Sequence, residues 1–250
     1  MKTIFFALVF SMTVFGMKAQ NVNSGFAVIE LFTSEGCSSC PPAEKVLNRI
    51  IEETKNNGKN IFCLEYHVDY WNRLGWKDPF SKNQFTRRQN NYSSVLQQRE
   101  LYTPQMIVNG ETEFVGSQSD LADVSIAEAL KSPAILKLMI ESDSASADTL
   151  FIRYNSSQTN KNYSLHFAIV EDHLVSKILK GENSGMTLTH HGVVRIFYSV
   201  DLNNNKGLAR IPNKGMNLND DCRLIAFVQH KQTMKILGAT EKKLSLPVKQ

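Results

Sequence analysis

Residues 26–42 read FAVIELFTSEGCSSCPP, and this stretch decides how the rest of the chain is interpreted. Its first seven residues form a compact apolar run, which predicts a buried β-strand. A polar loop follows, and Cys37 and Cys40 then stand just before two prolines. Proline is tolerated in the first turn of a helix, because the N–H that it lacks would have no partner there. The stretch therefore predicts a strand, a short loop and the start of a helix.

Strand and helix patterns continue to alternate after this stretch. Apolar residues spaced for one helix face lie between residues 43 and 51, and Gly58 is a typical stop signal. Residues 61–68 are interpreted as a second strand, and an Asn-Gly turn predicts a hairpin over residues 104–115. This alternation is typical of an α/β domain. Further helices are predicted over residues 85–101 and 121–130.

The second half of the chain has a different pattern. After Pro133, apolar and polar residues alternate in runs bounded by Asn, Ser and Gly clusters, which predicts antiparallel strands in a β-sandwich. The predicted fold class is therefore an α/β domain followed by an all-β domain. The expected segments are a removable leader over residues 1–19, the α/β domain over 20–132 and the β-sandwich over 133–250.

The first residues have the three-part pattern of a secretory signal peptide. Lys2 supplies a basic start, residues 4–15 are almost wholly apolar, and Ala19 is a small residue before the expected cleavage point. The apolar run is shorter than the roughly 20 residues of a membrane-spanning helix, although an N-terminal anchor is the alternative. We therefore expect a periplasmic or secreted protein with no membrane span after cleavage.

The composition excludes several classes of protein. The chain has 250 residues, of which 42% are hydrophobic and 21% charged, as in an ordinary globular protein. Its net charge is +4, and removal of the leader with Lys2 and Lys18 lowers the charge to +2. Nucleic acid is not expected as a partner, because that affinity needs clustered positive charge. Four cysteines in this length also exclude a disulfide-stapled scaffold.

Cys37 and Cys40 carry the chemistry that the sequence predicts. A helix N-terminus has unpaired N–H groups and the positive end of the helix dipole, and both stabilise a thiolate. Cys37 is expected to be the exposed attacking sulfur and Cys40 the buried resolving one. A single CxxC is also compatible with half of a zinc site or with an inert disulfide. Cys63 is expected to be an inert core thiol, and a Cys63–Cys222 bridge is the less favoured alternative.

A second element, Thr103-Pro104 before a short apolar strand, strengthens the redox interpretation. Thioredoxin folds keep a cis-proline at such a place, in a loop that faces the CxxC and binds extended thiol substrates. Residues 26–131 resemble a thioredoxin-fold domain. The chain also resembles a bacterial secreted family of unknown function with that fold. The resemblance lies in the stretches VIELFTSEGCSSCPP (28–42), YHVDYWNRLGWKDPF (66–80) and YTPQMIVNG (102–110), and in residues 181–195.

The resemblance implies a thioredoxin-like fold, a dithiol site at Cys37 and Cys40, and Pro104 opposite them. It implies no substrate. The chain departs from ordinary thioredoxin in having Ser38-Ser39 where thioredoxin has Gly-Pro, and in lacking a Trp beside the first cysteine. It also inserts residues 69–84 before the proline loop. These departures leave the direction of electron transfer open.

Several further residues are candidates for the site. Glu30 is the only charged residue of the first strand, and a buried carboxylate there would relay a proton to Cys40. A solvent-facing Glu at the end of the strand is the alternative. The backbone of Thr103 is expected to orient the partner. Trp71 and Trp76 lie in the aromatic insertion and are candidate substrate-binding residues, unless that loop simply packs its rings onto the core.

The histidine patterns are less specific. Glu65 and His67 lie two apart on the second strand and so share a face, where a hydrogen-bonded structural pair is favoured over a place in the site. His190 and His191 are adjacent, so on a strand they point to opposite faces and are interpreted as structural. No metal ligand is assigned.

The sequence thus favours an exported thiol–disulfide oxidoreductase that acts on protein or small-molecule thiols and disulfides, with no organic cofactor. Two alternatives from other classes stay open. One is an extracytoplasmic Cu(I) chaperone in which His67 joins the two thiolates. The other is a non-enzymatic binding protein in which the Cys37–Cys40 disulfide is static. The sequence does not specify an oligomeric state.

Overall fold

The structure is a computed structural model of the chain, and it describes residues 25–146, 148–214, 216, 219 and 221–244. The expected signal peptide, residues 1–19, lies outside the described residues. Among the helices that are described, none is long and apolar enough to cross a lipid bilayer.

The described residues contain more strand than helix. The helices are α1 (Pro41–Asn57), α2 (Asn83–Val95) and α3 (Ser119–Lys131), with one short 3-10 helix, η1 (Asn72–Leu74). The strands of the first half are β1 (Ala27–Thr33), β2 (Ile61–His67), β3 (Gln105–Val108) and β4 (Thr112–Val115). Those of the second half are β5 (Leu138–Ala145), β6 (Thr149–Ser156), β7 (Tyr163–Glu171), β8 (Leu174–Lys177), β9 (Thr187–His190), β10 (Val193–Asp201), β11 (Lys206–Pro212), β12 (Cys222–His230) and β13 (Ile236–Lys243).

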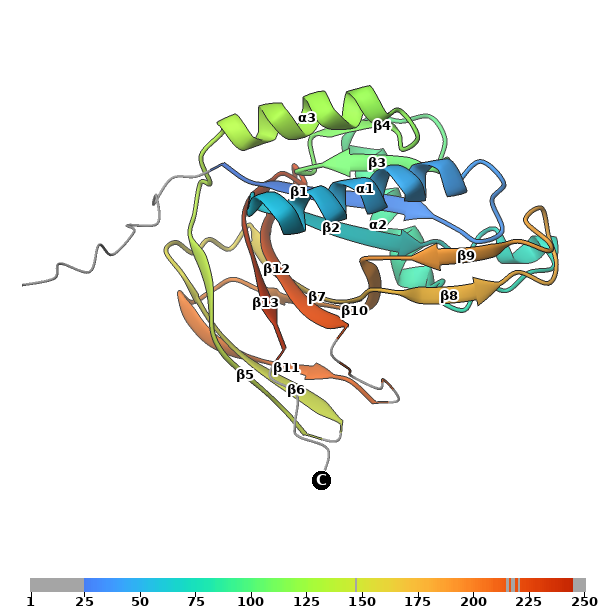
Figure 1. The fold of residues 1–250 in the computed structure, drawn as a ribbon. Helices are drawn as coiled ribbons and strands as arrows, with labels where there is room; N and C mark the ends of the chain where they lie inside the picture. The colour runs from blue at the N-terminus through green and yellow to red at the C-terminus, as the bar shows by residue number, and fades with distance from the viewer. Residues whose placement is uncertain (1–24, 147, 215, 217–218, 220, 245–250) are drawn as a thin grey trace, which may run out of the picture.

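One eight-stranded sheet runs through both halves of the chain, in the order β13-β12-β7-β10-β2-β1-β3-β4 (Figure 1). Within it, β1 pairs parallel with β2 and antiparallel with β3. β10 joins the other edge of β2 as a parallel neighbour, where Val193 is the register partner of Glu65. Two smaller sheets complete the fold: β11, β6 and β5 form one, and the hairpin of β8 and β9 forms the other.

The predicted fold class, an α/β thioredoxin-like domain followed by a β-sandwich, is wrong. The described residues are mostly strand with three helices, and the mixed eight-stranded sheet draws its strands from both sides of residue 133. The physical reason is that the outer edge of β2 presents unpaired N–H and C=O groups, for which β10 supplies partners. Alternation along the chain shows which side chains face a core, but not which strand will lie beside which.

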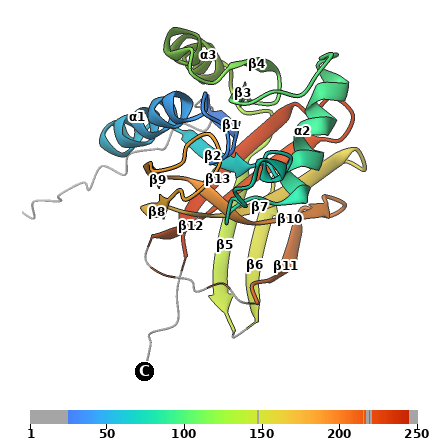
Figure 2. The ribbon, with the colours of Figure 1, turned by 90° about the vertical axis from the view of Figure 1, so that its right-hand side faces the viewer.

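Three buried clusters hold the layers together. α1 and α3 pack on the face of β1 to which Ile29 and Leu31 point, and α2 packs on the face to which Val28 and Phe32 point. Figure 2 shows α1 and α2 on opposite sides of β1 and β2. β1 is buried along its whole length, which explains its nearly continuous apolar sequence. The third cluster lies between the β11-β6-β5 sheet and strands β7 and β12.

Candidate functional site

The cysteine pair lies where β1 and β2 end. These parallel strands end side by side, because Thr33 is the register partner of His67. The loop after β1 carries Cys37 and leads into α1, whose N-cap is Cys40 and whose first two residues are prolines. The predicted strand, loop and helix start are therefore confirmed.

Cys37 and Cys40 form a disulfide, and their Cα atoms lie 5.4 Å apart. The N–H of Cys40 donates to the carbonyl oxygen of Cys37 at 3.2 Å, which closes the turn between them. Both cysteines are 0% exposed, whereas Ser38 and Ser39 are exposed. The expectation that Cys37 is exposed is wrong for this oxidised form, because segments from elsewhere in the chain cover the sulfur.

Thr103 is one of the residues that cover Cys37. Its hydroxyl accepts a hydrogen bond from Trp71 Nε1 at 2.8 Å and donates one to Cys37 Sγ at 3.3 Å. The Thr103-Pro104 peptide bond is cis, and the carbonyl oxygen of Pro104 accepts a bond from the Gly116 N–H at 2.9 Å. The structure thus brings Thr103 to Cys37, with Trp71 hydrogen-bonded to Thr103 and Pro104 next along the chain.

The loop between β8 and β9 also covers the cysteine turn. Asn183 Nδ2 donates to the backbone carbonyl oxygens of Glu35 and Cys37, at 2.9 Å each. The exposed Glu182 carboxylate accepts a hydrogen bond from the Ser38 N–H at 3.0 Å, and the Ser38 contacts lower its pKa. No role was predicted for these two residues, because Asn183 is 146 residues from Cys37 and no motif links them.

A pocket of about 470 Å³ lies beside this arrangement. Trp71 and Thr103 line it, so the pocket adjoins Thr103, the residue whose hydroxyl contacts Cys37. It offers aromatic surfaces and the Arg73 guanidinium to a bound group. The other lining residues are Tyr70, Thr86, Leu101 and Tyr102.

Glu30 lies away from the cysteines. Its carboxylate forms a buried ion pair with Arg88 of α2, whose Nη2 donates to Oε1 at 2.8 Å, and it also accepts a bond from the Tyr92 hydroxyl. The side chain points to the α2 face of β1, whereas α1 packs on the opposite face. Neither the proton relay to Cys40 nor the solvent-facing alternative matches this position, because Glu30 is 0% exposed and has its own partners.

Trp76 lies beside a group of buried ionisable side chains next to the cysteine turn. Its Nε1 donates a hydrogen bond to Glu35 Oε2 of that group at 2.7 Å. Within this group, His67 Nε2 lies 2.9 Å from Glu65 Oε1, which confirms the predicted hydrogen-bonded pair. His190 from β9 reaches the same Glu65 oxygen at 3.0 Å. We call the group the buried carboxylate–histidine cluster; its members are Glu35, Glu44, Glu65, His67, Asp78 and His190.

His190 is the member that was predicted to be a structural residue. It is 125 residues from Glu65, so no local pattern could have placed the two together. The prediction that His190 and His191 do not share a site is consistent with the structure, because His191 lies against His173, with ring centroids 4.8 Å apart.

Charges of opposite sign set the pKa values within the cluster. Burial by itself lowers the pKa of His67, but Asp78 and Glu65 outweigh it and raise that pKa well above its usual value. Burial by itself also lowers the pKa of His190, but Glu65 and Glu35 outweigh this effect and raise that pKa. Burial raises the pKa of Glu44 to about 7, and the nearby charge of Glu65 acts in the same direction.

The two remaining cysteines are free thiols in the core. Cys63 is 3% exposed and Cys222 is 1% exposed, and the structure forms no bridge between them. Burial raises the pKa of the Cys63 thiol to about 12. Since the thiolate is the reactive form, the prediction of an inert Cys63 agrees with this environment.

Comparison with solved structures shows where the fold recurs. A crystal structure of a protein from Agrobacterium tumefaciens is 24% identical with a TM-score of 0.62, and the match covers 90% of this chain and 96% of that one. At this identity the likeness shows a shared fold alone. A domain of the outer membrane lipoprotein Omp28 from Porphyromonas gingivalis is 13% identical with a TM-score of 0.25, and the match covers 45% of this chain and 90% of that one.

Comparison with families and curated proteins completes the assignment. No curated protein matches the chain. Residues 28–229 match the family model described as a protein of unknown function, DUF1223. The predicted resemblance to a family of unknown function is thus confirmed, whereas its thioredoxin-like description is not. Because the match spans most of its length, the chain belongs to the DUF1223 family.

Proposed function

We propose that this chain is an exported thiol–disulfide oxidoreductase whose redox pair is Cys37 and Cys40. The observation that carries the proposal is their disulfide at the start of α1, with the Thr103 hydroxyl 3.3 Å from Cys37 Sγ. A helix N-terminus suits reversible exchange, because its N–H groups and dipole stabilise a departing thiolate. The leader pattern in residues 1–19 supports export. The pocket beside Trp71 and Thr103 is the expected partner site.

The exchange follows from ordinary thiol chemistry. A partner thiolate attacks Cys37 Sγ, the bond between Cys37 and Cys40 breaks, and Cys40 leaves as a thiolate. The partner's second thiolate then attacks the partner's first sulfur in the mixed disulfide, and Cys37 leaves as a thiolate. The partner dithiol is oxidised by two electrons, the protein disulfide is reduced, and the partner's two protons pass to the protein thiols or to solvent. The same steps in reverse reduce a partner disulfide.

Both cysteines are buried, so exchange requires the residues that cover Cys37, Thr103 and the loop with Asn183, to move away from it. The bonds that must break are the two from Asn183 to backbone carbonyls and the one from the Thr103 hydroxyl to Cys37 Sγ. Each such bond contributes about 0.5–1.5 kcal/mol net, so opening costs roughly 2–4 kcal/mol. Contacts with a bound partner can offset a cost of this size.

Burial of both cysteines favours a second candidate, a non-enzymatic binding protein in which the disulfide is static. A structural disulfide of that kind has a reduction potential below about −300 mV. The Cu(I) alternative gains no such support. Both ring nitrogens of His67 face carboxylates, those of Glu65 and Asp78, rather than the sulfurs.

Redox titration of the protein without residues 1–19, with mass-spectrometric trapping of thiols, separates the two candidates. For the oxidoreductase we expect two-electron reduction confined to Cys37 and Cys40, at a potential between about −300 and −120 mV. Cys63 should stay unlabelled in the folded protein, because its thiol has a pKa of about 12.

Catalysis is then measured by insulin reduction and by refolding of scrambled ribonuclease. Cys37→Ser should abolish both activities. Cys222→Ser is the matched control and should keep them, since the Cys222 thiol only donates to Asn219 and a hydroxyl can do the same. No activity in either assay, together with a disulfide that resists reduction to below about −300 mV, would establish the static disulfide instead.

A further inference from the structure

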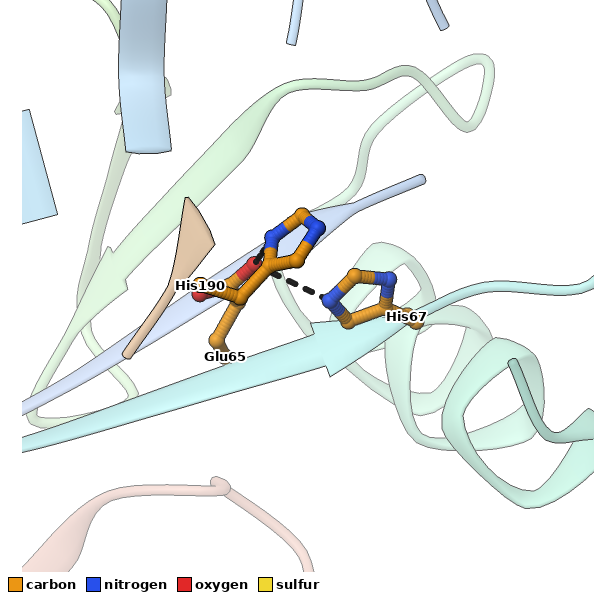
Figure 3. A group of neighbouring side chains, drawn as sticks. All are labelled: Glu65, His67 and His190. Atoms are coloured by element: carbon orange, nitrogen blue, oxygen red, sulfur yellow. Dashed lines mark hydrogen bonds and ion pairs between the residues drawn. The ribbon is translucent and has the colours of Figure 1, made fainter. Parts of the chain in front are cut away.

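Glu65, His67 and His190 belong to the buried carboxylate–histidine cluster, and Figure 3 shows their side chains pointing toward one another. One ligand atom from each lies within 4.8 Å of the others, and all three side chains are 0% exposed. Glu65 Oε1 lies 2.9 Å from His67 Nε2 and 3.0 Å from His190 Nδ1. Two imidazoles and a carboxylate therefore point at one place from β2 and β9.

Each imidazole also has a carboxylate on its far side. His67 Nδ1 lies 2.7 Å from Asp78 Oδ2, and His190 Nε2 lies 3.3 Å from Glu35 Oε1. Asp78 is itself held by the backbone N–H groups of Glu35 and Phe80, at 2.9 Å each. Metal-binding histidines typically donate their second ring N–H to a carboxylate, which orients the ring and strengthens the ligand.

The charges and hydrogen bonds of the cluster are incomplete without another cation. Four of its members are carboxylic acids, and in the described part of the chain the only cations that pair with them are the two histidines. Among the described residues, Glu65 Oε2 is buried without a hydrogen-bond partner, while Glu35 Oε1 and His190 Nε2 have only each other, as an ion pair at 3.3 Å. Buried polar atoms are nearly always partnered, and buried charges are paired or bind metals.

We propose that Glu65, His67 and His190 bind a divalent first-row transition-metal ion, with Asp78 and Glu35 orienting the two imidazoles. Two imidazole nitrogens and a carboxylate oxygen form a ligand set of Zn²⁺ and Fe²⁺ sites. Ligand atoms around a tetrahedral Zn²⁺ lie ~3.3 Å apart, so the two Glu65 contacts need to open by a few tenths of an ångström. The two imidazole nitrogens, which lie within 4.8 Å of each other, need to move closer together.

Glu44 is the candidate fourth ligand. Its Oε2 lies 3.6 Å from His190 Nδ1, while its Oε1 accepts a hydrogen bond from the Thr33 hydroxyl at 2.7 Å. The site uses neither Cys37 nor Cys40, so it does not rest on the redox function proposed above.

The first test measures bound Zn²⁺ in the protein without residues 1–19, refolded with Zn²⁺ and desalted with its disulfide intact so that no exchange-active thiol is free. We expect one Zn²⁺ per chain and a higher melting temperature than in protein refolded with a chelator. His67→Gln and His190→Gln should lose the bound Zn²⁺. Asp78→Asn should weaken binding by about 10- to 100-fold, because it removes only the orienting carboxylate.

A matched control addresses the surface histidines. His173 is exposed and lies against His191, so this pair is the competing place for adventitious zinc. His173→Gln should leave the bound Zn²⁺ unchanged. Loss of zinc in His173→Gln with retention in His67→Gln would overturn the proposal, and so would wild-type protein that binds no stoichiometric Zn²⁺.

A spectroscopic measurement on the wild-type protein covers the case in which the histidine variants fail to fold. Zinc K-edge X-ray absorption should show two imidazoles, oxygen ligands at ~2.0–2.2 Å and no sulfur at ~2.3 Å. A sulfur shell would place the metal on the cysteines and overturn the assignment. Cys37→Ser should lose disulfide exchange and keep the zinc, so failure of either proposal can be told from failure of the other.

Discussion

The Arg88 guanidinium contacts both halves of the chain at once. It pairs with Glu30 of β1 and donates to Gln229 Oε1 of β12 at 3.2 Å. It also lies over the rings of Phe197 and Phe227, 4.8 and 5.3 Å from their centroids. Glu30 is therefore better explained as the counter-ion that allows this cation to be buried than as a catalytic acid.

Arg88→Met tests this role. Removing one partner of a buried ion pair leaves the other charge uncompensated, and we expect the free energy of unfolding to fall by about 3–5 kcal/mol. Chemical denaturation followed by circular dichroism measures the loss. Arg87→Met is the matched control, because Arg87 is the exposed neighbour on the same helix and should change stability by less than about 0.5 kcal/mol. A similar loss in both variants would contradict the assignment.

His166 makes stability depend on pH. Burial lowers its pKa well below the usual value, and the Arg88 charge acts in the same direction. The folded protein keeps this imidazole neutral, whereas the unfolded chain protonates it near pH 6.5. Below that pH the unfolded state binds more protons, so the free energy of unfolding falls as the pH decreases, by up to about 1.4 kcal/mol per pH unit.

Urea denaturation at pH 7.5 and 5.5 measures this contribution. His166→Gln can keep a hydrogen bond to Ser199, which His166 Nδ1 meets at 2.7 Å, but it cannot titrate. We expect the variant to lose less stability than the wild type between the two pH values. The same loss in both proteins would show that His166 does not contribute.

Among the elements, α1 and the β8–β9 loop hold the disulfide in place. α1 begins with Cys40 as N-cap and two prolines, and it ends at Gly58, whose φ of 64° places it in the left-handed region that suits a helix end. The β8–β9 loop contributes Asn183, which ties down the backbone at Glu35 and Cys37. The helix positions the sulfurs, and in the proposed function the loop would control access to them.

Asn183→Ala tests the control of access. Loss of two hydrogen bonds, each contributing about 0.5–1.5 kcal/mol, should raise the population with an open cover and speed reduction by dithiothreitol roughly 5- to 100-fold. Thiol trapping over time measures the rate. Ser184→Ala is the control, because that exposed hydroxyl only donates to the Leu179 carbonyl within the same loop. Equal rates in the two variants would mean that the loop is not the barrier.

Several elements were predicted to within a few residues. β1, β2, α1, α3 and the hairpin of β3 and β4 match the expected ranges closely, because each has an apolar period or a turn signal of its own. The helix expected over residues 85–101 ends instead at Val95. Gln97 takes a left-handed φ of 54° just beyond it, which stops the helix before the proline loop.

For the molecule as a whole, the core does not divide at residue 132. The cluster beneath α2 combines Phe32 and Phe85 of the first half with Val170, Ile225 and Phe227 of the second. β10 and β2 are neighbours in the same sheet. The two halves therefore share both a sheet and an apolar core.

Production of residues 20–132 alone tests this interdependence. The fragment would expose the outer edge of β2 and the apolar face beneath α2, so we expect it to aggregate or to lack a cooperative thermal transition. Circular dichroism during heating measures the transition, with the protein lacking only residues 1–19 as the reference. A monomeric fragment that unfolds cooperatively would contradict this expectation.

Local patterns in the chain were enough to specify the strand before the cysteines, the helix that starts at Cys40 and the pairing of Glu65 with His67, because each depends on neighbours within a few residues. Only the packed molecule decided that both halves share one sheet and that Cys37 is buried. It also decided that Asn183 lies against Cys37 and His190 against Glu65. The contacts of Asn183 and His190 join residues more than a hundred positions apart. Strand edges and buried charges select such partners by geometry and by the cost of leaving polar groups unpaired.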